Sequence, residues 1–377
     1  MADRGARSAR GDRPILVAAG GTGGHLFPAQ ALSAELQTRG CVIDLVTDER
    51  ALRYGGTFPA RATHTIAAAT PTGGSLISKG MAALTLGWGT LSAFRLLRRL
   101  KPAALVGFGG YPTVPPVMAA SLLGVPVILH EQNAVMGRAN RFLAGRVRKV
   151  ATGFPDISGA GDAISTICVH TGNPVRPSVL EAAQQAYPGR DGGKLKVLVT
   201  GGSQGAHIMS KIVPLALASL SADERDRVEL VQQARGEDEL NVRLAYLTMH
   251  FEAEIAPFFA DLPQRIAAAH LVIARSGAST VSELAVIGRP SILVPFPFAL
   301  DQDQAANAAQ LSGAGAATII RQDDFTPDRL AEELRAALND PEAQQAKAQA
   351  AKASGVPDAA ARLADLVQSV IAGESRG

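Results

Sequence analysis

The feature that most constrains this chain is a pattern of strand, glycine loop and helix that occurs twice. The first copy, ILVAAGGTGGHLFPAQ at residues 15–30, runs from an apolar segment into a glycine cluster and then into a helix-like segment. The second copy, KVLVTGGSQGAHIMS at residues 196–210, repeats that order. Short apolar runs alternate with helical segments between and after them. This alternation is typical of βαβ units, so we expect an α/β fold of two Rossmann-like domains with parallel sheets.

The expected domain boundaries follow from the two copies. The segment TGNPVRPSV, with its Asn-Pro and Arg-Pro steps, is typical of a linker. We expect the binding site in a cleft between the two facing sheets, at the carboxyl ends of their strands. The predicted parts are a disordered basic N-terminus (1–13), an N-terminal Rossmann-like domain (14–171), a C-terminal Rossmann-like domain (172–354), and a helix and tail that pack back on the N-terminal domain (355–377).

The first glycine loop fits a phosphate or another bulky polar ligand, because its backbone N–H groups and the following helix N-terminus favour anions. It is not a Walker A loop, since no Lys follows the glycines. It is not the dinucleotide fingerprint either, since Leu26 occupies the third glycine position. A tight turn without any ligand explains the same residues, and this segment alone leaves both interpretations open.

The distribution of charge indicates an anionic partner. Residues 51–150 contain twelve Lys and Arg residues but only one carboxylate, Glu131. Such a block favours binding to nucleic acid, anionic lipid or a phosphorylated substrate. No segment approaches the ~18 apolar residues of a membrane span, so we expect a soluble cytoplasmic protein. Cys41 and Cys168 form no CxxC pattern, and we expect both to be buried free thiols.

Two loops of the N-terminal half carry polar residues after predicted strands. GFGGYPTVPP (107–116) is a second glycine loop, and HEQNAVMGRANR (130–141) places His130 and Glu131 at a strand end. Polar side chains at the carboxyl ends of parallel strands are typical of binding sites. The alternative is a buried polar pair that only holds the loops together.

Two loops of the C-terminal half are open to two interpretations each. RSGASTVSEL (275–284) fits a Thr280–Glu283 capping box and also an anion site at a helix start, and the two can occur together. In PFPFALDQDQAANA (295–308), an Asp-x-Asp pattern either holds a metal on a diphosphate or supplies an Asp N-cap for the next helix.

Residues 75–102 combine apolar side chains at helical spacing with a ring of cations. The segment is too short and too rich in glycine to span a bilayer, but it fits an interfacial membrane patch. The alternative is an amphipathic helix packed on its own sheet. The predicted patch consists of Lys79, Trp88, Phe94, Arg95, Arg98 and Arg99.

Taken together, GGTGGHLFPA, GFGGY, HEQNAVMGRANR, TGNPVR, GGSQGA, RSGASTVSEL and DQDQAANA resemble, in order and spacing, the MurG family of bacterial N-acetylglucosaminyltransferases. The resemblance covers about residues 14–372. It implies GT-B architecture and an inverting transfer of GlcNAc from UDP-GlcNAc to the 4-hydroxyl of MurNAc on lipid I, the undecaprenyl-diphosphate-linked MurNAc-pentapeptide, giving lipid II.

The resemblance also implies the partners. They are UDP-GlcNAc, lipid I, the anionic surface at the cytoplasmic face of the bacterial inner membrane, and the cell-wall synthesis machinery, with no cofactor and no nucleic acid. The rival hypotheses are a UDP-sugar epimerase on the same scaffold and a non-catalytic scaffold that binds nucleotide sugars at the membrane.

The family's site residues carry over by motif. By this resemblance, Glu283 binds the ribose hydroxyls and Gln304 binds the GlcNAc hydroxyls. Two positions depart from the family pattern: Phe259 replaces a smaller residue, and Asp303 replaces a glutamine. Gly109, Gly110 and Tyr111 are expected to bind the acceptor. The donor-binding residues are Thr22, Gly23, Gly24, Asn133, Arg176, Ser203, Phe259, Ala278, Ser279, Thr280, Val281, Ser282, Glu283 and Gln304.

An inverting transfer needs a base opposite the leaving UDP, and His25 is the first candidate. It follows the first glycine loop, where a plain turn would use a small residue, and an imidazole titrates near neutrality. Glu131 is the alternative base, and His25 could instead donate to a lipid I phosphate. We expect no protein-bound metal.

Overall fold

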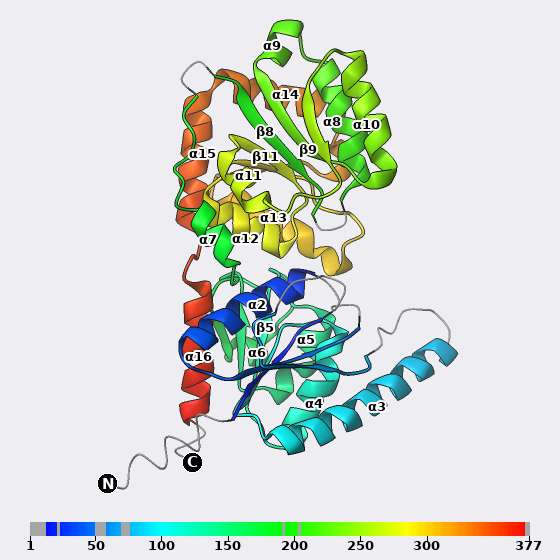
Figure 1. Ribbon diagram of the computed structural model, residues 1–377, viewed down its shortest axis with the longest axis vertical. Helices are drawn as coiled ribbons and strands as arrows, with labels where there is room; N and C mark the ends of the chain where they lie inside the picture. The colour runs from blue at the N-terminus through cyan, green and yellow to red at the C-terminus, as the bar shows by residue number, and fades with distance from the viewer. Residues whose placement is uncertain are drawn as a thin grey trace. The chain divides into compact units, whose positions relative to one another are not determined.

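The structure is a computed structural model of the 377-residue chain, and it divides into two compact units (Figure 1). Unit 1 comprises Met1–Arg176 and Pro357–Gly377, and unit 2 comprises Pro177–Val356. The first division falls five residues later than the expected boundary at residue 171. The structure describes residues 13–20, 23–49, 58–68, 76–190, 193–202 and 205–373, apart from the side chains of 76–79 and 300.

The sheet of unit 1 has seven parallel strands in the order β3-β2-β1-β4-β5-β6-β7. Strands β1, β2, β4 and β5 are buried along their whole length, which is why each reads as an apolar run in the sequence. Cys41 and Cys168 are half-buried rather than buried. Cys41 lies two residues before β2, and Cys168 is the first residue of β7. The strands are β1 (Ile15–Ala18), β2 (Ile43–Thr47), β3 (Ala62–Thr65), β4 (Ala104–Gly107), β5 (Val127–Glu131), β6 (Lys149–Thr152) and β7 (Cys168–His170).

The C-terminal helix α16 belongs to unit 1 and packs on α2 (Figure 1). Leu363 and Val367 share an apolar cluster with Leu32 and Leu36, and the Arg39 guanidinium donates to the Asp365 carboxylate at 2.6 Å. The helices of unit 1 are α2 (Gly23–Thr38), α3 (Leu76–Leu100), η2 (Tyr111–Thr113), α4 (Val114–Leu122), α5 (Arg138–Leu143), η3 (Ala144–Arg146), α6 (Asp162–Ser165) and α16 (Ala359–Gly373).

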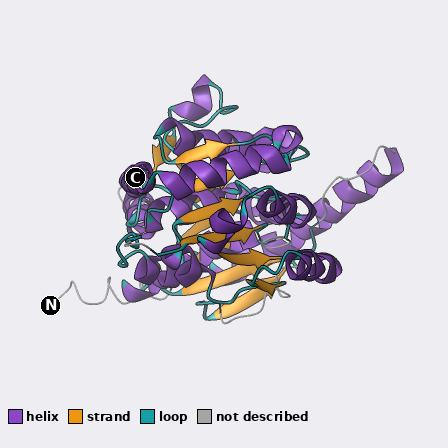
Figure 2. Ribbon diagram, turned by 90° about the horizontal axis from the view of Figure 1, so that it is seen from above, coloured by secondary structure: helices purple, strands orange, loops and turns teal. Residues whose placement is uncertain are grey.

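Unit 2 has six parallel strands in the order β10-β9-β8-β11-β12-β13, and helices flank the strands (Figure 2). The strands are β8 (Leu195–Thr200), β9 (Val228–Gln233), β10 (Ala253–Ala256), β11 (Leu271–Ala274), β12 (Ser291–Leu293) and β13 (Ala317–Ile319). The helices are α7 (Pro177–Ala182), α8 (His207–Ala218), α9 (Ala222–Asp226), α10 (Gly236–Thr248), α11 (Leu262–Ala268), α12 (Ala278–Ile287), η4 (Leu300–Gln302), α13 (Asp303–Gly313), η5 (Gln322–Asp324), α14 (Pro327–Asn339) and α15 (Pro341–Ser354).

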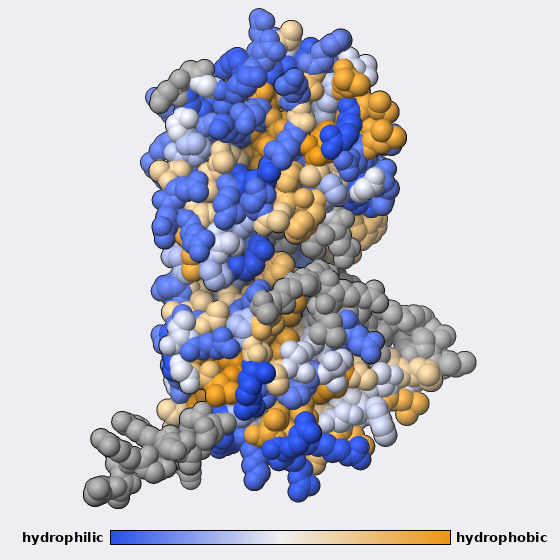
Figure 3. All heavy atoms as spheres, viewed as in Figure 1, coloured by the Kyte–Doolittle hydropathy of each residue, from blue (hydrophilic) through white to orange (hydrophobic). Residues whose placement is uncertain are grey.

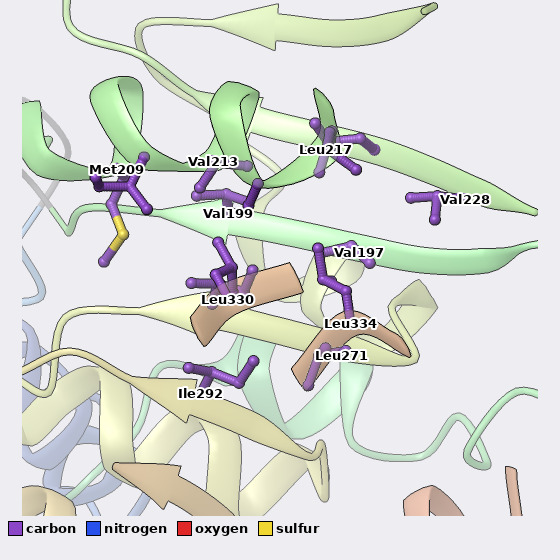
Figure 4. Packing of buried hydrophobic residues seen from close by; sticks show 14 of the residues in the cluster. Val197, Val199, Met209, Val213, Leu217, Val228, Leu271, Ile292, Leu330 and Leu334 are labelled. Atoms are coloured by element: carbon purple, nitrogen blue, oxygen red, sulfur yellow. The ribbon is translucent and has the colours of Figure 1, made fainter. Parts of the chain in front are cut away.

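The core of unit 2 forms where β8 meets the helices on one face of the sheet (Figure 4). Val197 and Val199, two residues apart on β8, point to the same face and pack with Val213 of α8. Leu330 and Leu334, one helical turn apart on α14, belong to the same buried cluster. Burying each such side chain contributes about 1.5–3 kcal/mol, so this cluster fixes the sheet against its helices.

The strand order positions the glycine loops. In unit 1 the order reverses between β1 and β4, and in unit 2 it reverses between β8 and β11. At such a switch point the two following loops diverge and leave a crevice at the carboxyl ends of the strands. The described residues of the loops at these points are 19–20 and 108–110 in unit 1 and 201–202, 205–206 and 275–277 in unit 2.

Candidate functional site

His25 lies in the first turn of α2, directly against the glycine turn that follows β4. A Cβ added to Gly109 would lie 3.5 Å from Cδ2 of His25, and one added to Gly110 would lie 3.5 Å from its Cε1. Both glycines have a positive φ, of 81° and 74°, which side chains rarely adopt. The first turn of α2 therefore contacts the turn after β4, and the positive φ angles of that turn favour glycine at both positions beside the imidazole.

The His25 imidazole is set up to be neutral at neutral pH. Burial lowers its pKa below the ordinary value of 6.5, and a hydrogen bond to the Gly20 backbone opposes this only in part. Because a ring N–H donates to the Gly20 carbonyl, the other ring nitrogen keeps its lone pair. A neutral imidazole with a fixed tautomer can accept a proton from a hydroxyl group.

Glu131 ends β5 and organises the loop that follows. Its side chain is 2% exposed, and its carboxylate accepts hydrogen bonds from Asn133 N at 3.0 Å, Gly137 N at 2.9 Å and Asn140 Nδ2 at 2.8 Å. Burial raises the pKa of Glu131, while these hydrogen bonds lower it in part. The carboxylate therefore receives donors at both of its oxygens, which suits a group that shapes a loop.

His130 is a buried link between three segments. Its Nε2 donates to the Gly172 carbonyl at 3.1 Å, and its Nδ1 accepts from Gln132 Nε2 at 3.2 Å. Gln132 also donates to the Phe108 carbonyl at 3.0 Å. Burial lowers the pKa of His130 to about 4, so the ring stays neutral and holds the ends of β4 and β5 to residue 172.

Arg176, the last residue of unit 1, stacks on the first turns of α2. Its guanidinium lies 4.5 Å from the centre of the Phe27 ring, and a Cβ on Gly23 would lie 3.0 Å from that ring. Gly23 and Gly24 open α2, and Tyr111 opens the short helix η2 beside the glycine turn. Thr22 and Ser203 lie outside the described residues.

In unit 2 the loop after β11 is fastened to α13. Ser276 Oγ donates to the Gln304 carbonyl at 2.8 Å, and Asn307 Nδ2 donates to the Ser276 carbonyl at 3.2 Å. Gln304 Oε1 accepts from Phe296 N at 3.0 Å. These bonds fix the direction in which α12 begins.

The capping box expected at Thr280 and Glu283 is wrong. Helix α12 begins at Ala278 with Gly277 as its N-cap, so Thr280 and Glu283 lie inside the helix, and Gly277 has no side chain that could cap it. The N–H groups of the first turn therefore remain suited to an anion. Residues 278–283, expected at the donor, make up this first part of α12.

The expected Asp cap of α13 is wrong as well. Asp303 is the first residue of the helix, Gln302 is its N-cap, and no side-chain cap bond forms there. Burial raises the pKa of Asp303, and the Asp301 charge adds to this. Among the residues that the structure describes, no group of three or more His, Cys, Asp or Glu side chains is arranged to hold a metal ion.

Phe259 is covered by a cation that the sequence interpretation missed. The ring is buried, and the Arg265 guanidinium lies 4.3 Å from its centre. Arg265 is held in turn by Asp261 at 2.8 Å and Glu254 at 2.7 Å. One face of the predicted base-contacting ring is therefore already occupied.

Helix α3 carries the predicted patch, and its first half projects from the rest of unit 1 (Figures 1 and 2). Trp88 is 64% exposed, and the patch arginines at 95, 98 and 99 are exposed. Phe94 differs from expectation, because it is half-buried against the core, with the Arg98 guanidinium 5.9 Å from its ring centre. The side chain of Lys79 lies outside the described residues. Further exposed apolar side chains of unit 1 are Met81, Leu84, Leu91, Leu122 and Phe142.

None of the helices in the described ranges is both long and apolar enough to cross a membrane.

Comparison with known proteins identifies the family. Residues 15–152 match the glycosyltransferase family 28 N-terminal domain, and residues 196–363 match the family's C-terminal domain. The chain belongs to glycosyltransferase family 28. The enzyme is 57% identical over 363 residues to the UDP-N-acetylglucosamine–N-acetylmuramyl-(pentapeptide) pyrophosphoryl-undecaprenol N-acetylglucosamine transferase of Methylorubrum populi, covering 96% of this chain and 98% of the relative. It is 53% identical over 363 residues to the transferase of the same name from Brucella suis, covering 96% and 95%.

Solved structures agree with this assignment. The crystal structure of Acinetobacter baumannii MurG superposes on this family 28 enzyme with a TM-score of 0.77 and 29% identity, covering 95% of this chain and 99% of that one. The structure of UDP-GlcNAc 2-epimerase from Neisseria meningitidis superposes with a TM-score of 0.64 and 15% identity, covering 94% of this chain and 100% of that one. At this identity the likeness shows the shared fold alone. The MurG-family resemblance, the fold class and the glycosyltransferase activity predicted from sequence are confirmed.

Proposed function

We propose that this glycosyltransferase moves GlcNAc from UDP-GlcNAc to the 4-hydroxyl of MurNAc in lipid I and so produces lipid II. The names of relatives that align over 95% or more of the chain support this choice of substrates. The observation that carries the chemistry is the neutral His25 imidazole held against the Gly109–Gly110 turn. This turn and His25 are the proposed acceptor side.

In the proposed reaction His25 acts as the general base. Its unprotonated ring nitrogen removes the proton of the 4-hydroxyl while the oxygen attacks C1 of GlcNAc. The bond from C1 to the UDP oxygen breaks on the opposite face, so the anomeric centre inverts and UDP leaves with the electron pair. The lowered pKa of His25 keeps the base ready at neutral pH.

The donor diphosphate is assigned to the N-terminal turn of α12 and to Arg176. A helix N-terminus offers backbone N–H groups and the positive end of the helix dipole, and a guanidinium binds phosphate oxygens. We assign the ribose to Glu283 and the sugar hydroxyls to Gln304, with Asn133 and the first glycine loop beside the donor sugar. The buried Phe259, stacked under Arg265, is assigned to the edge of the uracil site.

We further propose that the enzyme is peripheral at the cytoplasmic face of the inner membrane, held there by α3. Exposed Trp88 and Leu84 supply apolar contact, and the arginines at 95, 98 and 99 supply attraction to anionic lipid. Other components of cell-wall synthesis are the expected protein partners.

The deciding experiment incubates the enzyme with labelled UDP-GlcNAc and a soluble lipid I analogue and measures labelled product. His25→Ala should lower kcat by about 10²–10⁴-fold, the usual range for loss of a general base, with the KM for UDP-GlcNAc little changed. Because burial places the pKa of His25 below 6.5, the wild-type rate should stay level near neutral pH and fall only on the acid side. This acid limb should flatten in the variant.

Three results would contradict the proposal in different ways. Absence of transfer by the wild-type enzyme would refute the proposed substrates. UDP-GlcNAc binding without turnover would favour a binding scaffold. Transfer by His25→Ala within a few-fold of wild type would keep the reaction but remove His25 as its base.

A further inference from the structure

Asn140, in α5, was not among the residues that sequence reasoning selected, yet it joins the two parts of the acceptor side. Its Nδ2 donates to Glu131 Oε2 at 2.8 Å and lies 3.3 Å from the His130 carbonyl. A Cβ on Gly109 would meet Asn140 Nδ2 at 3.3 Å, Asn140 Oδ1 at 3.5 Å and His25 Cδ2 at 3.5 Å. The amide and the imidazole therefore border the same bare position of the glycine turn.

The direction of the Asn140 amide is set by the carboxylate. An ionised Glu131 can only accept hydrogen bonds, so the NH₂ end of the amide must face it and the oxygen must face away. Asn140 is 2% exposed, and its Oδ1 has no hydrogen-bond partner among the described residues. A buried acceptor without a donor is costly, so its retention beside His25 points to a donor that arrives with a ligand.

We propose that Glu131 and Asn140 act as one positioning pair for the acceptor substrate. The carboxylate fixes the amide, and the amide oxygen so directed accepts a hydrogen bond from a hydroxyl or amide N–H of the acceptor sugar, beside the hydroxyl that His25 deprotonates. In this role Glu131 never takes a proton from substrate. The inference rests on the proposed transfer to a lipid-linked sugar.

An exchange of the two polar groups tests the pair directly. In Glu131→Gln the new NH₂ group can turn toward Asn140, although Gly137 N then loses its acceptor, and Asn140 flips so that its oxygen faces residue 131 and its NH₂ faces the glycine turn. In Glu131→Gln combined with Asn140→Asp, the new carboxylate accepts from the new NH₂ group and again presents an oxygen to the turn. The single variant should lose about ten- to a hundredfold in kcat/KM for the acceptor, and the double variant should recover part of that loss, because the lost bond from Gly137 N is common to both variants.

The same exchange separates positioning from base catalysis. If Glu131 were the base, the amide introduced by Glu131→Gln could not accept the proton, and the double variant would stay as inactive as the single one. That result would overturn the inference. The KM for UDP-GlcNAc should remain within about twofold in Asn140→Ala, because no donor contact is assigned to Asn140. The Glu131 variants are compared on acceptor kinetics, because Glu131 also holds Asn133 of the donor side.

Asn140→Ala keeps the test decisive if Glu131→Gln does not fold. Gly137 N and Asn133 N still satisfy Glu131 in this variant. We expect a loss of about ten- to a hundredfold in kcat/KM for the lipid I analogue, with UDP-GlcNAc binding retained. Acceptor kinetics equal to wild type would overturn the inference, whereas failure of the wild-type enzyme to use the analogue would instead refute the proposed function.

Asp44→Asn is the matched control for loss of a buried carboxylate in unit 1. Asp44 lies in β2, fully buried, and accepts two bonds from Arg61 at 3.0 and 2.7 Å. The variant should lower the thermal midpoint of the enzyme but leave kcat and both KM values near wild type at a temperature where it is folded. An equal loss of acceptor kinetics in this control would show that the Asn140 effects report stability alone.

Discussion

Glu131 of unit 1 and Arg289 of unit 2 are both buried ions, and the two units use them in opposite ways. Their side chains belong to residues that are 2% and 1% exposed, and neither forms an ion pair with another described residue. Glu131 receives hydrogen bonds from N–H groups. Arg289 donates to five carbonyl groups, at residues 185, 186, 267, 287 and 288.

The difference follows from the two edges of a parallel sheet. Glu131 ends β5, at the edge where loops and helix N-termini present N–H groups. Arg289 precedes β12, at the opposite edge, and its carbonyl partners end α11 and α12 or follow α7. Helix C-termini leave carbonyls unsatisfied and carry partial negative charge, which suits a cation. At the first edge an anion therefore accepts from loop N–H groups, and at the second edge a cation donates to carbonyls at helix ends.

The largest expected effect comes from removing the cation of unit 2. Arg289→Met should lower the free energy of unfolding by about 3–5 kcal/mol, because several buried carbonyls lose their donors at once. Burial lowers the pKa of Arg289 to about 10, so the loss should be the same from pH 6 to pH 8, where the group stays charged. Urea unfolding followed by circular dichroism measures the change.

Arg289→Lys is the matched control, since it keeps the charge but has three donors instead of five. Its loss of stability should be smaller than that of Arg289→Met. Both variants should retain kcat at a temperature where they are folded. Loss of turnover with unchanged unfolding would place Arg289 in the chemistry and break the comparison between the two edges.

The surfaces of the units also differ in charge, with the signs reversed relative to the two buried ions. Helix α10 of unit 2 exposes an apolar row, Leu240, Leu244 and Leu247. Figure 3 shows an apolar patch on the upper right of the molecule, over α10. Carboxylates at 237, 238 and 239 lie in the first turn of that helix, whereas arginines at 95, 98 and 99 lie in the last two turns of α3. Only α3 should therefore be attracted to an anionic membrane.

Replacing the three arginines of α3 by Gln should weaken binding to anionic vesicles at low salt. Each near-surface cation contributes about 1 kcal/mol at most, so the partition coefficient should fall by roughly ten- to a hundredfold. Higher salt should shrink the difference because it screens surface charge. Sedimentation with vesicles measures the bound fraction, and UDP-GlcNAc binding should be retained.

Leu240→Ser with Leu244→Ser in α10 is the control. It removes exposed apolar surface from unit 2 without changing its charge and should leave vesicle binding at the wild-type level. If it weakens binding as much as the arginine variant, the two apolar faces are equivalent and the contrast in charge has no consequence.

The sheets and their loops were predictable from sequence because parallel strands read as apolar runs and the residues after them are polar. Glu131 was selected for that reason and His25 because it follows a glycine loop, and their roles remain predictions. The site details that depend on three-dimensional neighbours were not predictable. Asn140 lies nine residues after Glu131 and reads as an ordinary helix residue in RANRFL. Only the chain reversal between β5 and α5 brings its amide to the carboxylate.

Other errors have similar causes. The Thr280–Glu283 spacing fits a capping box, but α12 starts two residues before Thr280. Thr280 therefore lies inside the helix and cannot be its N-cap. Arg289 reads as a loop cation in IGRPSIL, and nothing in that segment shows that separate helices bring carbonyls to it.

The smallest expected effect concerns metal. A catalytic metal contributes several kcal/mol to a transition state, so a metal-dependent enzyme loses nearly all its turnover in EDTA. Here the donor diphosphate is assigned to the α12 N-terminus and Arg176, and burial raises the pKa of Asp303, which makes its carboxyl a poorer ligand at low pH. We expect turnover in EDTA to stay within about twofold of the untreated enzyme. Radiolabel transfer with and without EDTA measures this. If activity is lost in EDTA, restored by Mn²⁺, and no longer restored in Asp303→Ala, then unit 2 holds its diphosphate through a metal rather than through helix N–H groups.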